Sequence, residues 1–191
     1  MSVIERLLRR EGDPETIAGL AITPMRRRDL RGGVMEIEKV SYPRPWSTGV
    51  FESEIGQMRD GSRRYLVARR AAAGGGRAPI VGYAGLWFAA GEGHVTNVAV
   101  KPSEQRCGVA TALLLSLADS VIDRGCTAWT LEVRVSSVGA QALYRGFGFA
   151  PAGVRPRYYE NTEDALVMWC NDVQSPAYAD LLASIRDRLD R

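Results

Sequence analysis

The hydrophobic pattern of this chain alternates between segments of strand type and segments of helix type. Short runs of β-branched and aromatic residues are typical of strands, whereas apolar residues three and four positions apart are typical of helices. Strands are predicted at residues 19–24, 65–68, 80–89, 95–100, 128–135 and 165–169, with a further strand beginning at 148. Helices are predicted at residues 2–10, 29–40, 47–55, 109–124, 138–146 and 175–189. This order predicts an α/β (α+β) domain with a mixed, mostly antiparallel, twisted sheet of about seven strands flanked by helices.

The length of the chain is that of one domain with a short addition at each end. Of its 191 residues, 46% are hydrophobic, which is enough for a sizeable core. We expect an N-terminal helical extension at residues 1–18, a single domain at 19–170 and a C-terminal helix at 171–191. Two segments without a strand or helix pattern, residues 71–79 and 155–164, are predicted to be loops within that domain.

Charge and cysteine content argue against several classes of protein. The formal net charge is only +3, which does not favour broad binding of nucleic acid. No stretch approaches the roughly 18 apolar residues of a membrane span, and the N-terminus lacks the apolar core of a signal peptide, so a cytoplasmic protein is expected. The three cysteines have unrelated spacings that indicate neither a disulfide framework nor a metal site, so no metal is expected.

The segment from Val95 to Leu115 joins a strand to a helix through a turn that suits an anion. The strand stops at Pro102, and an apolar helical run opens after Gly108. Backbone N–H groups at a helix start lack partners within the helix and are backed by the positive end of the helix dipole. Gly108 allows a phosphate to approach closely, and Arg106 adds a positive charge. The turn is neither a Walker A loop nor a GxGxxG fingerprint, and an ordinary strand–turn–helix crossover is the alternative.

Glu132 stands in the middle of a predicted strand, where a carboxylate needs a partner or a function. Strand periodicity places it on the same face as Thr130 and Arg134, and opposite Leu131 and Val133. One interpretation is an ion pair with an arginine, for which Arg134 is a candidate. The other is a general base, which such a pair would hold in its ionised form.

Two further side chains combine possible chemistry with a structural explanation. Tyr144 lies on the helix after the Glu132 strand and is either a core residue or a phenol that reaches the same cleft. Cys107 stands at the predicted helix start and raises the alternative of an acyl-cysteine intermediate. We expect no such intermediate, because the only histidine of the chain, His94, is predicted to lie far back on the strand side and offers no obvious base.

Together these segments resemble the motifs of the GNAT family of N-acetyltransferases. The loop QRCGVA at residues 105–110 matches the family's Q/R-x-x-G-x-G/A loop and follows a V-x-V-x-P strand end, as in that family. Residues 137–149 are similar to its N-x-x-A-x-x-L-Y-x-x-x-G-F motif, with Ser137 in place of the asparagine. The segments I-E, P-W-S, L-E-V-R and Y-Y…E-D-A, spread over residues 22–168, resemble the ribosomal-protein-alanine N-acetyltransferase group of the family.

The resemblance implies direct transfer of an acetyl group from acetyl-CoA to an amine, without an acyl-enzyme. Glu132 stands at the position of the family's general base, acting through water, and Tyr144 at that of its general acid toward the CoA thiolate. The resemblance implies that acetyl-CoA is bound by Val98, Ala99, Val100, Arg106, Cys107, Gly108, Val109, Ala110, Thr111 and Ser137. It implies a peptide side of the cleft lined by Trp46, Arg134, Tyr158 and Tyr159.

The acceptor that the resemblance suggests is the N-terminal α-amine of a protein, with the alanine of a ribosomal protein as the specific case. At pH 7, deprotonation costs about 1 kcal/mol for an α-amine with a pKa of about 7.8, against about 4.6 kcal/mol for a lysine with a pKa of about 10.4. A single carboxylate acting through water suits the α-amine. Three alternatives stay open: acetylation of a small amine such as a polyamine, an amino acid or an aminoglycoside; a CoA-binding module without turnover; and an interaction protein that uses the C-terminal helix. A monomer and a homodimer both fit the sequence.

Overall fold

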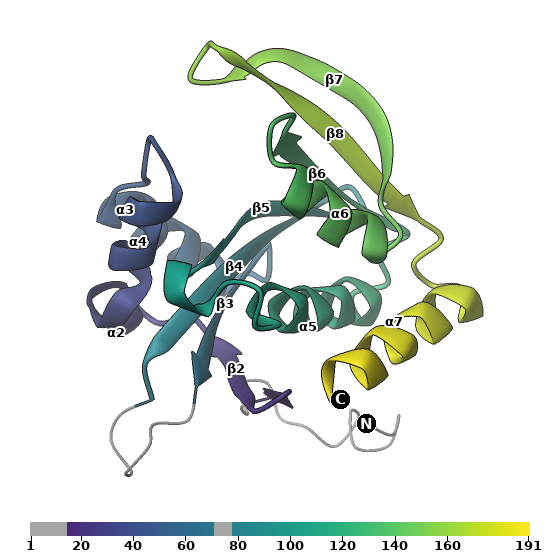
Figure 1. Ribbon diagram of the computed structural model, residues 1–191, viewed down its shortest axis with the longest axis horizontal. Helices are drawn as coiled ribbons and strands as arrows, with labels where there is room; N and C mark the ends of the chain where they lie inside the picture. The colour runs from purple at the N-terminus through teal and green to yellow at the C-terminus, as the bar shows by residue number, and fades with distance from the viewer. Residues whose placement is uncertain (1–14, 71–77) are drawn as a thin grey trace.

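An open, twisted sheet runs through the domain and positions every other element (Figure 1). The computed structural model describes residues 15–70 and 78–191. Within these residues the sheet has eight strands in the order β1-β2-β3-β4-β5-β6-β8-β7. They are β1 (Glu15–Ile17), β2 (Leu20–Pro24), β3 (Arg63–Arg70), β4 (Ile80–Ala89), β5 (Glu92–Val100), β6 (Ala128–Arg134), β7 (Ala150–Tyr159) and β8 (Glu163–Asn171). Only β5 and β6 are parallel neighbours in this part of the chain, so the predicted mixed, mostly antiparallel sheet is confirmed.

Helices pack on both faces of the sheet. The helical elements are α2 (Arg27–Asp29), the π-helical turn η1 (Leu30–Val34), α3 (Met35–Ser41), α4 (Thr48–Gln57), the 3₁₀ turn η2 (Pro102–Glu104), α5 (Val109–Asp123), α6 (Val138–Gly146) and α7 (Pro176–Leu189). The helices α4 and α7, expected from sequence at residues 47–55 and 175–189, begin at serine caps: Ser47 Oγ accepts from Val50 N–H at 3.4 Å, and Ser175 Oγ accepts from Tyr178 N–H at 3.2 Å. Among the helices of residues 15–70 and 78–191, none has the length and apolar content needed to cross a membrane.

The core consists of two clusters, one on each face of the sheet. The larger lies under α5, whose Leu113, Leu114 and Leu117 are fully buried, and it also receives side chains of α6 and α7. The smaller lies under α2, η1, α3 and α4, where Phe51 packs edge-on against Tyr83 at a centroid distance of 5.6 Å. Each fully buried leucine or phenylalanine contributes about 1.5–3 kcal/mol through removal of its surface from water. The two clusters hold the sheet between them and fix the positions of its strand ends.

Three sequence predictions require correction. Residues 15–17 form the edge strand β1, which pairs with β2, so the sheet begins before the predicted boundary at residue 19; residues 1–14, where the helical extension was predicted, lie outside the described residues. The predicted loop at 155–164 is instead the end of the β7–β8 hairpin, because β7 continues to Tyr159. The helix predicted from Asp29 begins after Arg26, and Asp29 caps it from the third position by accepting Arg26 N–H at 2.9 Å. Most of the other predicted loop, residues 71–77, also lies outside the described residues.

Candidate active site

The parallel strands β5 and β6 separate halfway along their length. They pair only from Glu92 to Val95 on β5 and from Ala128 to Leu131 on β6. The next residue of β5, Thr96, is the extra residue of a β-bulge, where the register with β4 shifts. A bulge bends its strand and increases the local twist, which accounts for the departure of β5 from β6. Beyond it the described strands share no ladder, an arrangement that leaves an edge of β5 at which an extended ligand that carries amides can pair.

The separated half of β5 carries three of the residues predicted to bind acetyl-CoA. Val98, Ala99 and Val100 all lie beyond the bulge, and Ala99 is buried against the α3–α4 side of the sheet. Tyr42, in the segment after α3, donates its hydroxyl to the Val98 carbonyl oxygen at 2.9 Å. The loop between α3 and α4 therefore reaches the strand edge at which the predicted ligand contacts lie.

The start of α5 has the geometry of an anion site. Gly108 is its N-cap with a φ of +79°, in the left-handed region that favours glycine, and Arg106 before it also has a positive φ of +62°. The first turn contains no acidic residue, and Arg106 and Cys107 are exposed. The amides of Val109, Ala110 and Thr111 belong to the first turn of a 15-residue helix, whose N–H groups have no acceptors in the helix. The predicted phosphate turn thus has the expected shape, and its binding of a ligand stays a prediction.

Glu132 is a buried, ionised carboxylate at the point where β5 and β6 part. Its side chain is only 6% exposed. One carboxylate oxygen, Oε2, lies 2.9 Å from His94 Nε2, and the other, Oε1, lies 3.0 Å from Arg155 Nη1. The hydrogen bond from His94 is the largest influence and lowers the pKa of Glu132; burial opposes it, while the charges of His94 and Arg155 strengthen the lowering. Glu132 therefore stays charged at neutral pH.

The structure gives Glu132 two partners that the sequence did not identify. His94 was predicted to lie far back on the strand side, where it offers Cys107 no obvious base; the parallel register sets His94 beside Thr130, on the face of the sheet that Glu132 shares, and the side chains of His94 and Glu132 touch. Arg134 was considered as the partner of Glu132, whereas the arginine that pairs with it is Arg155 of β7. The sequence alone did not reveal His94 and Arg155 as partners of Glu132. Their positions depend on two strand registers, that of the parallel pair β5 and β6 and that of the bulged hairpin β7–β8, and neither register is encoded locally.

Tyr144 lies on α6 with its phenol buried, at 8% exposure. Burial raises the pKa of Tyr144 to about 12, so the phenol keeps its proton through the neutral range. Burial also raises the pKa values of Tyr42 and Tyr159, and in both the nearby Tyr144 contributes to the increase. Three phenols thus approach one another from α6, the loop after α3 and β7. A phenol that keeps its proton is in the form that a general acid needs.

The β7–β8 hairpin is fastened to the end of β6. Arg134 pairs with Glu160 at 2.7 Å and with Glu163 at 2.8 Å, and its guanidinium lies 4.2 Å from the centre of the Tyr159 ring. Tyr159 in turn donates its hydroxyl to the Glu132 carbonyl oxygen at 3.0 Å. Arg134 therefore holds the hairpin in place, while the neighbouring Tyr158, 49% exposed, is available to a substrate.

Glu38 organises the segment that carries Trp46. This carboxylate, 1% exposed, accepts the backbone N–H of Trp46 at 2.6 Å and a hydrogen bond from the Tyr83 hydroxyl. The Trp46 ring, half-buried, packs at a tilt against Phe51 with a centroid distance of 5.5 Å. One buried acid thus fixes the backbone of the predicted substrate-binding residue.

Replacing Glu38 with alanine is expected to lower the free energy of unfolding and to raise KM for the acceptor substrate. The change leaves the Trp46 amide and the Tyr83 hydroxyl without their acceptor, at roughly 1–3 kcal/mol for each buried unpaired donor. Urea unfolding followed by circular dichroism measures the loss. Glu36→Ala, on the exposed side of α3, is the matched control and should stay within about 0.5 kcal/mol of wild type. Equal stability of the two variants would contradict the role given to Glu38.

These features define a class of enzyme. The sequence model of the acetyltransferase (GNAT) family matches residues 32–149, and the chain belongs to this family. The protein is therefore an acetyl-CoA-dependent N-acetyltransferase. In residues 15–70 and 78–191, no group of three or more His, Cys, Asp or Glu side chains is arranged to hold a metal ion.

The chain is similar to individual proteins whose names belong to the group of enzymes that the sequence motifs indicated. The [ribosomal protein bS18]-alanine N-acetyltransferase of Escherichia coli K12 is 36% identical over 135 residues, which cover 69% of this chain and 84% of the relative. A Bacillus subtilis protein that carries this name in provisional form is 34% identical over 150 residues, or 78% of this chain and 93% of the relative. The crystal structure of the E. coli ribosomal-protein-S18-alanine N-acetyltransferase superposes with a TM-score of 0.67 at 30% identity, covering 80% of this chain and 94% of that one. The predicted family resemblance is confirmed.

Proposed function

We propose that this enzyme acetylates the N-terminal α-amine of a protein, and that its acceptor is the alanine of a ribosomal protein, as the names of its relatives state for them. One observation carries the proposal: an ionised carboxylate, Glu132, held between His94 and Arg155 where two parallel strands part. We expect the enzyme to act in the cytoplasm, where ribosomal proteins are made.

Both backbone groups and side chains bind acetyl-CoA. The amides of residues 108–111 face the diphosphate from the start of α5, with Arg106 beside them. The free edge of β5 at residues 98–100 pairs with the amides of the pantetheine arm. Ser137, the N-cap of α6, makes no capping hydrogen bond with its side chain, which agrees with a role for its hydroxyl toward the ligand.

Glu132 and His94 together accept the proton of the incoming amine. Because His94 Nε2 donates to Glu132, its Nδ1 is the ring nitrogen that can accept a proton from the amine through a water molecule. Glu132 stabilises the imidazolium that forms and fixes the orientation of the ring. An α-amine needs little driving force for this step, since its pKa of about 7.8 lies close to neutral pH.

Tyr144 completes the transfer on the other side of the reacting carbonyl. As the amine nitrogen bonds to the carbonyl carbon and the carbon–sulfur bond breaks, Tyr144 gives its proton to the departing sulfur. Its buried, neutral phenol is suited to that task. Trp46, Tyr158 and Tyr159 line the approach of the peptide, and Arg134 supports them by holding the hairpin.

The acceptor class is tested by offering labelled acetyl-CoA with a panel of amines. A peptide copying the alanine-initiated N-terminus of ribosomal protein bS18 should take up label, whereas the same peptide with a blocked N-terminus should not. Spermidine and an aminoglycoside, at equal concentration, should be acetylated at least about tenfold more slowly. Faster labelling of a small amine than of the peptide would overturn the proposed acceptor, and binding of acetyl-CoA without any transfer would overturn catalysis.

A further inference from the structure

The C-terminal helix α7 lies outside residues 32–149, which the family model matches, yet it is a fixed part of the domain. Tyr178, Leu182 and Ile185 are buried in the core cluster of α5 and α6. In Figure 1, α7 runs back from the end of the sheet alongside α5. The helix is therefore held in one place relative to the acetyl-CoA site.

The last turns of α7 lie beside the start of α5. Arg186 is fastened to α5 by both carboxylate oxygens of Asp119, at 2.7 and 2.6 Å. Leu189 reaches Gly108, because a Cβ added to Gly108 would stand 2.5 Å from Leu189 Cδ1. The end of α7 is thus next to the turn whose amides face the diphosphate in the proposed function.

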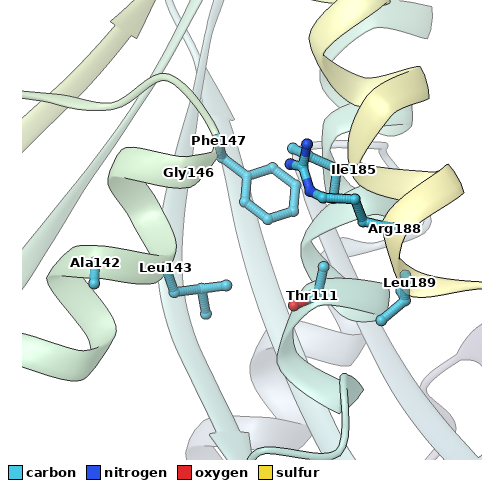
Figure 2. Close-up of a pocket in the computed structure, with 8 residues that line it drawn as sticks. All are labelled: Thr111, Ala142, Leu143, Gly146, Phe147, Ile185, Arg188 and Leu189. Carbon is cyan, nitrogen blue, oxygen red and sulfur yellow. The ribbon is translucent and has the colours of Figure 1, made fainter. Parts of the chain in front are cut away.

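Residues of α5, α6 and α7 border an open pocket at this position (Figure 2). Its volume is about 270 Å³, slightly less than the roughly 300–1,000 Å³ of pockets that take a whole drug-sized ligand. A pocket of this volume has room for one end of a long ligand. Its principal lining residues are Thr111 of α5, Leu143 of α6, Phe147 just after α6, and Ile185, Arg188 and Leu189 of α7.

The lining combines apolar faces with one cation. Leu143 and Phe147 come from one side and Ile185 and Leu189 from the other, which gives the pocket apolar walls against which a flat ring can pack. Arg188 extends over the pocket from α7, and its Nη1 donates to Ser184 Oγ at 2.6 Å, which fixes the guanidinium but uses few of its five N–H groups. An arginine beside an apolar slot and next to a phosphate-binding helix start suits a nucleotide that carries a phosphate.

We propose, on the basis of the proposed function, that α7 forms the outer wall of the site for the nucleotide end of CoA. The adenine ring lies between Leu143 of α6 and Ile185 of α7, and Arg188 binds the 3′-phosphate of the ribose. The occupant is the continuation of the ligand whose diphosphate lies at Gly108. The last helix of the chain thereby adds affinity and selectivity for CoA over its dephosphorylated form.

The test compares two ligands that differ only in that phosphate. Calorimetric titration of the full chain with CoA and with 3′-dephospho-CoA gives four dissociation constants for wild type and Arg188→Gln. The variant is expected to bind CoA about tenfold more weakly, as charge-assisted hydrogen bonds to phosphate are lost, and to bind 3′-dephospho-CoA as wild type does. Arg28→Gln, an exposed arginine of α2, is the control with the same change of charge and should bind both ligands as wild type does.

The outcomes separate this inference from the function on which it rests. An Arg188→Gln variant that binds both ligands as wild type does, or loses the same factor for both, would overturn the role of α7 while leaving the acetyltransferase site intact. Wild-type protein that binds neither ligand would instead overturn the acetyl-CoA site at the start of α5, and the inference with it.

Discussion

Replacing Glu132 with glutamine is expected to lower kcat/KM at pH 7 by about 10²–10⁴-fold, the usual contribution of a general base. Glutamine keeps the size of the side chain but cannot stabilise a positive imidazole at His94. The deficit should be measured from initial rates with an alanine-initiated peptide. Glu52→Gln, an exposed carboxylate of α4, is the matched control and should retain wild-type activity.

The pH profile distinguishes a base from a merely structural carboxylate. The lowered pKa of Glu132 keeps it ionised throughout the neutral and alkaline range, so the wild-type rate should not fall in that range through protonation of Glu132. In Glu132→Gln the imidazole of His94 loses the carboxylate that stabilises its charged form, so the rate should recover as the pH rises past the amine pKa of about 7.8 and the amine loses its proton to solvent. His94→Gln should show the same recovery of rate at high pH. Combined with Glu132→Gln in a double variant, it should lower the rate at pH 7 little further. A Glu132→Gln profile parallel to that of wild type would remove Glu132 from proton transfer.

The second large effect is expected for Tyr144→Phe, which should reduce kcat by about 10²-fold or more. The phenylalanine ring preserves the edge contact with Phe149 and the buried position, so acetyl-CoA affinity should change by less than about threefold. Calorimetry and initial rates on the same preparation measure the two quantities. Tyr178→Phe, another buried tyrosine, is the control and should keep its turnover.

Two other results for Tyr144→Phe would change the role given to Tyr144. Unchanged turnover in Tyr144→Phe would show that the CoA thiolate leaves without this proton, and Tyr144 would then be a core residue only. A parallel loss of affinity and turnover would mean that the phenol binds acetyl-CoA without acting as an acid.

The elements that carry local signals could be predicted from sequence. Ser47 and Ser175 cap the helices predicted at 47–55 and 175–189, and the turn predicted before α5 is present, with Gly108 at a positive φ. The alternation around Glu132 correctly placed it opposite the core residues Leu131 and Val133. These features depend on a few neighbouring residues, so a short window of sequence contains the information.

The features that depend on distant pairing could not be predicted. The three residues of β1 are too few to give a strand pattern and form a strand only through pairing with β2. His94 and Arg155 meet Glu132 only because β5, β6 and β7 are brought together in one sheet. The polar composition of the predicted loop at 155–164 indicated a loop, whereas the strand there is held by ladder pairing with β8 and by the Arg134 ion pairs. For the same reason, the prediction that Arg134 lines the peptide side of the cleft did not include its ion pairs with Glu160 and Glu163.

Transfer to an α-amine rather than to a lysine side chain is measured by locating the acetyl group on a peptide that offers both kinds of amine. The peptide begins with alanine and contains one lysine, and tandem mass spectrometry after reaction with acetyl-CoA identifies the modified nitrogen. We expect acetylation of the alanine α-amine with no detectable product at the lysine. Acetylation at the lysine side chain, or no product from enzyme that binds acetyl-CoA, would contradict it.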